Sequence, residues 1–234
     1  ILTDVTGVQT CALPIYIRFE SPRLTESSLR KITVFPNTLS FCLKASLSAL
    51  DESIIAFLSR VPEFDVMSYK NPGILGQAEV EEICTTANPS SVVLYSFSDK
   101  TASAVCARTS IRKLSVSAES VSADAFAQMK TLENLGSVEV SGLRLADSGL
   151  KGLAGVTTLR RVVLKPKTIS VTADAAETFA TLPELTEFEF TSETKGGAEV
   201  IKALAAAPKL KVLKYCAPDA ADVISMLSAF PALE

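Results

Sequence analysis

Apolar residues recur along the second half of the chain in the pattern φxxφxφ, where φ is apolar and x is any residue. The pattern starts at five positions: Ile111, Leu135, Leu159, Leu185 and Leu210. Successive starts lie 24, 24, 26 and 25 residues apart. The last three positions of the pattern alternate with the period of a half-buried strand. The sequence therefore predicts one short strand in each repeat of about 25 residues.

A second apolar series precedes each strand, at nine, six and three residues before its start. Its members are Phe126, Met129 and Leu132; Leu150, Leu153 and Val156; Ala176, Phe179 and Leu182; and Ile201, Leu204 and Ala207. A spacing of three places these side chains on one face of an α- or 3₁₀-helix. Each unit is therefore predicted to hold a strand, a turn and a short helix.

Residues at the unit boundaries agree with this division. Pro183 and Pro208 stand two residues before a strand start, where proline ends the preceding helix. Ser122 and Thr172 stand where a helix needs an N-cap.

The units nearer the N-terminus are less regular. One is predicted to start at Thr38 and the next at Phe64. The segment SVVLYSF belongs to a further unit, whose start could be Ser91 or Val92. The spacing from either residue to the next start is short, so the register over residues 71–110 stays open.

Residues 135–164, LGSVEVSGLRLADSGLKGLAGVTTLRRVVL, resemble the leucine-rich repeat. The resemblance is close over 111–234 and looser over 29–110. It implies an α/β fold, a leucine-rich-repeat solenoid with a parallel β-sheet on the concave face and short helices on the convex face. An ordinary α/β layer fold has the same alternation, but its crossovers need more residues than most of these units offer.

The repeats depart from the family pattern at one position. Eight residues after the strand start, the family usually has Asn or Cys, whose side chain satisfies loop backbone groups. This chain instead has Glu119, Leu143, Lys167, Glu193 and Pro218. The turns are therefore expected to close by backbone hydrogen bonds or by water.

Both ends of the chain suggest an incomplete reading frame. Residues 5–15, VTGVQTCALPI, match the in-frame translation of a sequencing-library adapter, so residues 1–15 are interpreted as an artefact. Residues 16–28 are interpreted as a lead-in segment, and 29–234 as a solenoid of about eight units. The start of a further strand at Leu233 predicts a truncated array. The cellular compartment stays unknown.

Composition excludes several classes of function. Lys and Arg number 23 against 26 Asp and Glu, a net charge of −3, without a long basic run, so a nucleic-acid partner is not indicated. No apolar stretch reaches the roughly 18 residues of a membrane-spanning helix.

Candidate chemistry is sparse. The chain has no histidine, which removes the commonest general base and metal ligand. Its five cysteines form no CxxC pair and are interpreted as apolar residues of a reduced protein, a weak indication of an intracellular location. The glycines of GLKGLAG lack phosphate-loop spacing, and the pair Glu187 and Glu189 is interpreted as a solvated face. We expect no enzyme, no cofactor and no metal.

The outward strand positions, two, four and six residues after each start, are predicted to line the concave face. The candidate partner-binding residues among them are Lys113, Glu139, Arg161, Val163, Lys165, Glu187, Glu189, Val212 and Lys214. Equal offsets become neighbours in a parallel stack, so Arg161 should meet Glu187, and Glu189 should meet Lys214. Val163 and Val212 would form an apolar centre. Cross-strand charge pairing alone would also explain the charges, and it does not exclude a partner footprint.

These observations favour a non-enzymatic module that binds a protein partner through the concave sheet. One alternative is a structural accessory subunit of a large assembly, held by its convex helices or its ends. Another is the substrate-receptor part of a ubiquitin ligase whose other domain is missing.

Overall fold

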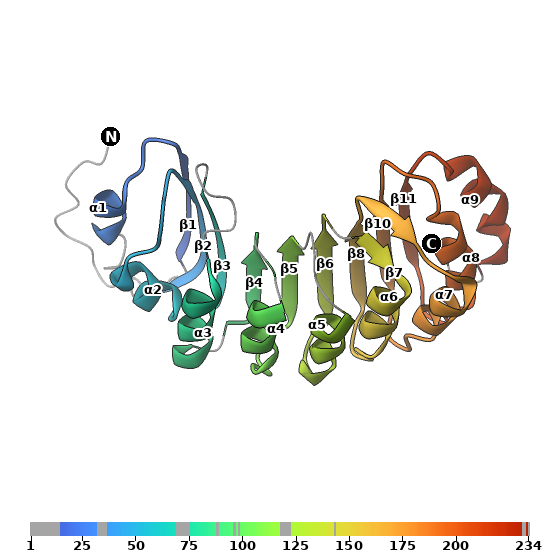
Figure 1. Cartoon of the computed structure of the whole chain (residues 1–234), viewed down its shortest axis with the longest axis horizontal. Coiled ribbons are helices and arrows are strands. Elements are labelled where there is room, and N and C mark those ends of the chain that lie inside the picture. The colour runs from blue at the N-terminus through green and yellow to red at the C-terminus, as the bar shows by residue number, and fades with distance from the viewer. Residues whose placement is uncertain are drawn as a thin grey trace.

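Strands and helices follow one another in repeated units through the described part of the protein, and in two units a second short strand precedes the helix (Figure 1). The computed structural model describes residues 15–31, 37–68, 75–87, 89–95, 97, 99–117, 123–142, 144–230 and 233.

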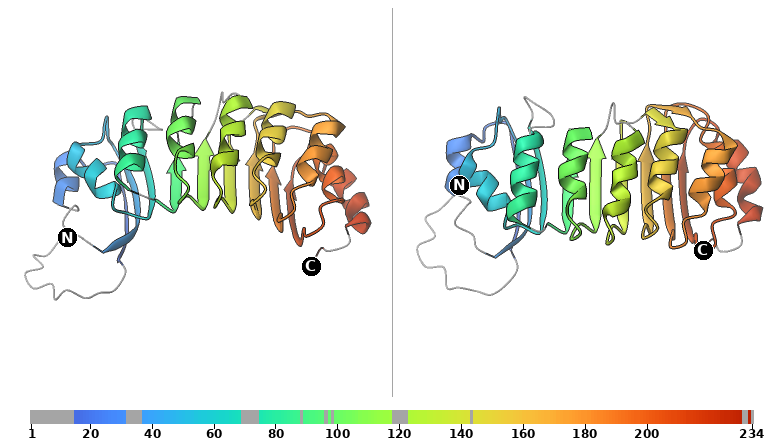
Figure 2. Two further views of the ribbon diagram at one scale, coloured as in Figure 1. Left: turned by 90° about the horizontal axis from the view of Figure 1, so that it is seen from below. Right: turned by 60° about the horizontal axis from the view of Figure 1, so that its bottom comes forward.

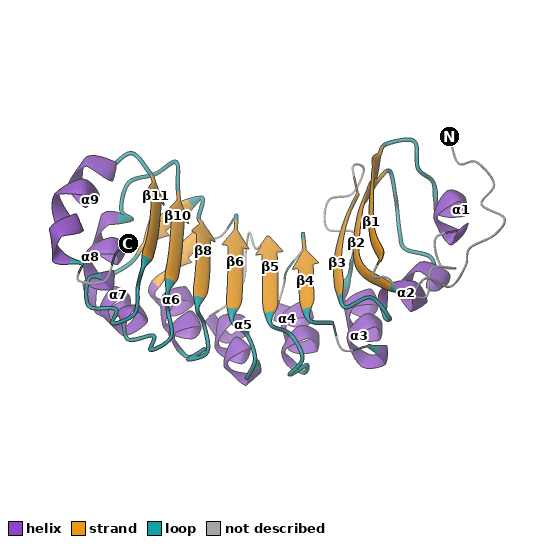
Figure 3. Ribbon diagram, turned by 180° about the vertical axis from the view of Figure 1, so that it is seen from behind, coloured by secondary structure: helices purple, strands orange, loops and turns teal. Residues whose placement is uncertain are grey.

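Nine parallel strands form the main sheet, side by side in chain order (Figure 3). They are β1 (Ile15–Ser21), β2 (Thr38–Ala45), β3 (Glu63–Ser68), β4 (Ser91–Leu94), β5 (Lys113–Ser117), β6 (Ser137–Ser141), β8 (Arg161–Lys165), β10 (Glu187–Thr191) and β11 (Val212–Cys216). Two short strands, β7 (Arg144–Ala146) and β9 (Thr168–Ser170), pair in a separate parallel sheet.

The helices cover the outer, convex side of this curved sheet (Figure 2). They are α1 (Glu26–Leu29), α2 (Glu52–Leu58), α3 (Gln77–Thr86), α4 (Asp99–Cys106), α5 (Ala123–Gln128), α6 (Asp147–Ala154), α7 (Ala173–Ala180), α8 (Ala198–Leu204) and α9 (Ala220–Met226). Consecutive helices from α2 to α9 pack against one another. Two 3₁₀ turns follow α5 and α9. The predicted α/β solenoid, with its sheet on the concave side and its helices on the convex side, is confirmed.

The apolar series of the sequence form a core between sheet and helices. All twelve helix-side residues predicted at nine, six and three positions before a strand start are buried. The inward strand residues are also buried from Ile111 to Leu210. Leu213 and Tyr215 on β11 are only partly buried, because no further strand flanks β11 within the described part of the chain.

A repeated backbone contact ties consecutive units together from the unit of β3 to that of β11. The carbonyl of Ser90 accepts two N–H groups from the following unit, those of Arg112 at 2.8 Å and Lys113 at 3.1 Å. The carbonyls in the same position of the other units accept two N–H groups in the same way: Pro62, Arg112, Gly136, Arg160 and Thr186. Two donors on one carbonyl fix where the next strand begins, so the contact sets the register of the stack.

This contact and the strand pairing correct the predicted starts of two early units. Val92 pairs with Leu114, the fourth residue of its pattern, so the unit starts at Pro89 and not at Ser91 or Val92. Phe64 pairs with Val92 and is likewise a fourth residue, so its unit starts three residues earlier than predicted. The segment SVVLYSF has apolar residues on both faces of the strand. Periodicity alone therefore cannot show which face is buried. The predicted start at Thr38 agrees with the register, since Phe41 pairs with Phe64.

The sheet begins before the expected solenoid boundary at residue 29. Ile17 and Phe19 of β1 pair with Phe41 and Leu43 of β2, so β1 continues the same register. Ile15, the last residue of the adapter-like stretch, is the first residue of β1. Residues 1–14 lie outside the described part of the chain.

The turns that lack the family's Asn or Cys close partly by backbone hydrogen bonds, as expected. The N–H of Gly142 donates to the carbonyl of Lys165 at 3.1 Å, and the N–H of Ser192 donates to that of Cys216 at 2.9 Å. The pairing of β7 with β9 adds a second link that the sequence analysis did not predict.

Carboxylates close two of these turns as well. Asp147 accepts hydrogen bonds from the N–H and hydroxyl of Thr172 at 2.7 and 2.9 Å, and Thr172 caps α7 as predicted. Asp219 accepts from the N–H groups of Gly196 and Ala198 at 3.0 and 3.3 Å, near the start of α8. Burial raises the pKa of Asp219, but these bonds and one from Tyr215 outweigh it and lower the pKa overall. The predicted cap Ser122 lies outside the described residues.

The glycine-rich run on α6 serves helix packing. A Cβ atom on Gly152 would lie 2.6 Å from the Cβ of Phe126 and 3.1 Å from the backbone nitrogen of Ala127. A Cβ on Gly149 would meet Leu145 and Phe126 only at ordinary contact distances. Gly152 therefore lets α6 approach α5 closely.

Replacing these two glycines by alanine should have opposite effects on stability. Gly149→Ala should stabilise the protein by about 0.5–1 kcal/mol, the usual gain for alanine over glycine in a helix. Gly152→Ala should destabilise it, because α5 and α6 must move apart. Urea denaturation of the two variants measures both changes. Equal stabilisation by both would show that the helices do not approach closely at Gly152.

Burial differs between two leucines that both belong to the repeat core. Leu153 is fully buried, so Leu153→Ala should cost about 2–5 kcal/mol. Leu213→Ala should cost clearly less, because part of its side chain is already in contact with solvent. Denaturant midpoints compare the two variants, and equal losses would contradict the partial exposure of β11.

Candidate partner-binding face

The nine candidate residues all lie on strands of the main sheet. Eight of them occupy four adjacent strands: Glu139 on β6; Arg161, Val163 and Lys165 on β8; Glu187 and Glu189 on β10; and Val212 and Lys214 on β11. Lys113 lies on the next strand, β5, where it pairs with Ser137 of β6. The structure therefore gathers most of the candidates and leaves Lys113 apart.

Predicted charge pairs form between β8, β10 and β11. Arg161 Nε lies 3.2 Å from Glu187 Oε2, and its Nη2 lies 3.7 Å from Glu189 Oε2. Lys214 Nζ lies 3.0 Å from Glu187 Oε1 and 3.9 Å from Glu189 Oε2. The hydrogen bond from Lys214 lowers the pKa of Glu187, and burial opposes this effect. The expected neighbours Arg161–Glu187 and Glu189–Lys214 are confirmed.

A further ion pair was not predicted. Lys165 Nζ lies 2.5 Å from Glu139 Oε1, across β8 and β6. The two residues have different offsets in their repeats, so this pair runs diagonally. A comparison of equal offsets could not find it, although long side chains reach such neighbours.

The expected exposure of Val163 is wrong, because the structure buries this side chain completely. Val163 lies between Glu139 and Glu189 on the neighbouring strands. Arg161 and Lys165 flank it along β8. These four ion-paired residues, named here the charged ring, surround Val163, and the aliphatic stems of Arg and Lys cover apolar surface well. Val163 therefore packs beneath these four side chains and is not accessible to a partner.

Val212 remains accessible, with 39% of its surface exposed. It lies on β11, the last strand of the sheet, and pairs with Glu187 of β10. Val212 is therefore the accessible apolar residue of the candidate face, at its edge and beside paired charges.

Sequence reasoning missed a second group, in the N-terminal part of the sheet on and beside β2, β3 and β4. Cys42 Sγ donates to Asp65 Oδ2 at 3.9 Å, while Asp65 Oδ1 is buried without a hydrogen-bond partner among the described residues. Burial, followed by the charge of Asp65, raises the pKa of both Cys42 and Tyr95. A raised pKa keeps the Cys42 thiol protonated, so it makes a poor nucleophile. The wrong register of two early units hid this group from the sequence analysis.

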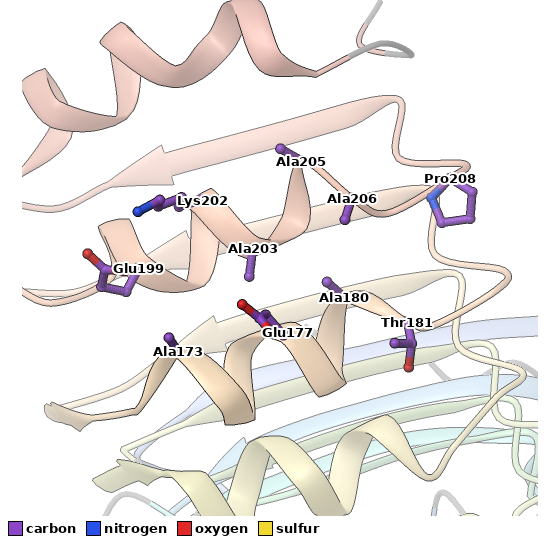
Figure 4. Close-up of a pocket in the computed structure, with 10 residues that line it drawn as sticks. All are labelled: Ala173, Glu177, Ala180, Thr181, Glu199, Lys202, Ala203, Ala205, Ala206 and Pro208. Atoms are coloured by element: carbon purple, nitrogen blue, oxygen red, sulfur yellow. The ribbon is translucent and has the colours of Figure 1, made fainter.

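A groove opens on the opposite, convex face between α7 and α8 (Figure 4). Its volume is about 670 Å³. Its lining residues are Ala173, Glu177, Ala180, Thr181, Glu199, Lys202, Ala203, Ala205, Ala206 and Pro208. The small side chains keep the groove wide, and Glu177, Glu199 and Lys202 supply its charges.

The fold is that of a leucine-rich-repeat solenoid. A leucine-rich-repeat protein of Leptospira interrogans superposes with a TM-score of 0.54 over 88% of this chain, at 13% sequence identity. An internalin of Listeria monocytogenes matches 89% of this chain and 68% of its own, with a TM-score of 0.48 and 13% identity. This chain spans half the length of the Leptospira protein. Neither protein-family models nor curated protein sequences give a match.

The helices of the described segments are too short or too polar for a membrane span. The described residues also place no group of three His, Cys, Asp or Glu side chains where it could hold a metal ion.

The burial of Val163 and the exposure of Val212 predict different responses to an introduced carboxylate. Val163→Asp should destabilise the protein by more than about 3 kcal/mol, because it places an unpaired charge in a buried position between two glutamates. Val212→Asp should cost less than about 1 kcal/mol, since an exposed edge position tolerates polar residues. Thermal and urea denaturation measure both changes. A Val163→Asp variant as stable as the parent would mean that this side chain reaches solvent.

Proposed function

We propose that this chain is a non-enzymatic module that binds a protein partner on the concave face of its sheet. The observation that carries the proposal is the accessible apolar side chain of Val212 beside a continuous set of ordered charges. The strands lie side by side, so these groups form one surface, and solenoids use such extended concave surfaces for binding.

The charges of this face suit a protein better than a polyanion. Three acidic residues balance three basic ones: Glu139, Glu187 and Glu189 against Arg161, Lys165 and Lys214. Nucleic-acid binding draws most of its affinity from an excess of cations over phosphates. A balanced surface lacks that excess and suits a partner that carries charges of both signs.

Affinity and specificity would come from different residues on this face. Exposed apolar anchors supply much of the affinity at protein interfaces, and charges at the rim tune specificity and the rate of encounter. Val212 would serve as the anchor. Glu187 and its partners Arg161 and Lys214 would select among partners.

The convex groove between α7 and α8 favours a second candidate function, that of a structural subunit held by its helices. Neighbouring subunits in an assembly could pack a helix or loop against the small residues of this groove. Lys202 on α8 lines the groove, so a substitution at Lys202 tests whether a partner binds there.

A pull-down from the source organism distinguishes the two surfaces. Val212→Asp should reduce recovery of the partner by about tenfold or more, as expected for an interface anchor. Glu187→Ala should reduce it less, because its charge partners keep Glu189 as an alternative. The matched control Lys202→Glu changes the charge of the convex groove and should leave recovery unchanged.

The opposite pattern would overturn the concave-face proposal. If Lys202→Glu alone loses the partner, the convex groove is the binding surface and the assembly-subunit hypothesis replaces the first. Circular dichroism and melting of each variant check that the fold is intact.

A further inference from the structure

A polar hollow lies at the start ends of β3, β4 and β5, away from the charged ring. Its volume is about 460 Å³. Its lining residues are Glu63, Ser90, Ser91, Ser110, Arg112, Lys113 and Asn134. We call it the strand-start hollow.

The cations of this hollow differ from the other candidate cations. Arg161, Lys165 and Lys214 all form ion pairs. Arg112 and Lys113 form neither an ion pair nor a side-chain hydrogen bond with any residue that the structure describes. Both are exposed. These two adjacent, exposed cations therefore have no ion-pair partner among the described residues.

Glu63 lines the other side of the hollow. Within the described chain it also lacks an ion pair. Glu63 pairs with Ser91, and Ser91 with Lys113, so one strand separates the acid from the base. Two strand spacings amount to about 9.5 Å, too far for direct contact between the two backbone positions.

The floor between these charges is small, polar and fixed. Ser91 is buried. The hydroxyls of Ser90 and Ser110 donate to the carbonyls of Pro62 and Pro89 at 3.3 and 3.1 Å. The amide of Asn134 donates to the carbonyl of Thr109 at 2.7 Å. These hydrogen bonds tie neighbouring units together, so the floor is preorganised and the charged side chains at the rim are left for a ligand.

We propose that the strand-start hollow receives an acidic side chain of the protein partner at Arg112 and Lys113, and a basic side chain of the same segment at Glu63. The proposal rests on the proposed function and names the chemistry of one part of the partner. An extended segment carries side chains two residues apart on one face, roughly 7 Å apart. The length of a lysine or arginine side chain covers the remaining distance to Glu63.

A carboxylate suits the site better than a phosphate. The hollow carries one negative and two positive side chains, a small net charge that a single carboxylate and a single ammonium group complement. A phosphoserine carries a charge near −2, and Glu63 would repel the excess. The ligand class is therefore a peptide segment with one acidic and one basic residue.

The test is an NMR titration of the ¹⁵N-labelled chain with short peptides. The main probe is acetyl-Gly-Glu-Gly-Lys-Gly-amide, and a second probe replaces its lysine by glutamate. Shifts should appear at the amides of Arg112, Lys113 and Glu63. The double variant Arg112→Gln with Lys113→Gln should bind the main probe at least about fivefold more weakly, consistent with the loss of two exposed charge contacts.

Two further variants separate the roles of the charges. Glu63→Gln should weaken the binding of the main probe and strengthen that of the doubly acidic probe. Arg160→Gln is the matched control, because Arg160 holds the position equivalent to Arg112 two units further along the stack. The hydrogen bond from Lys209 is the main cause that lowers the pKa of Glu184, and the positive charge of Arg160 adds to it. Arg160 therefore already has an acidic neighbour. This control should bind like the parent.

Three results would overturn the proposal. They are an absence of shifts with either peptide at millimolar concentration, equal weakening by Arg160→Gln, and tighter binding of a phosphoserine peptide than of the main probe. None of these results changes the pull-down result expected for Val212→Asp, because Val212 lies outside the hollow. If Val212→Asp leaves recovery of the partner unchanged in the pull-down while peptide binding is intact, that result counts against the proposed function alone.

Discussion

From β3 to β11, a single backbone carbonyl near the start of each strand accepts two N–H groups from the next unit, and the geometry of this part of the solenoid follows from the contact. It fixes the register of the parallel strands, so side chains with equal offsets become neighbours. The same register decides which residues face the helices and which face the concave side. Because the units differ in length, as from Phe64 to Val92 and from Val92 to Leu114, the connecting segments absorb the difference.

The sequence predicted the architecture well wherever apolar residues occupied only one face of each element. From residue 111 onward, the period of the pattern and the helix-side series located the strands and the core. Prediction failed at β4, where Val92 and Val93 are apolar on opposite faces of the strand. It also missed the pairing of β7 with β9, since three-residue strands carry too few residues to show alternation.

The candidate face shows the same division between what register determines and what it leaves open. Register alone predicted that Arg161 would meet Glu187. It could not predict the burial of Val163, which depends on how four long neighbouring side chains fold over it. Asp65 and Tyr95 escaped notice because their positions depend on the register that the sequence left open. The strand-start hollow combines the first residues of β3, β4 and β5 with residues of the loops before them, and periodicity contains no information about loop shape.

The internal neutralisation of the charged ring has a consequence for how a partner would approach. Charges already paired on the face create little electric field beyond a Debye length, about 8 Å at physiological ionic strength. The charged ring would therefore add little long-range steering, and a partner would meet it at the ordinary association rates of roughly 10⁵–10⁶ M⁻¹ s⁻¹ for protein pairs. Selectivity among partners would then reside chiefly in how long each complex lasts, because short-range fit governs dissociation.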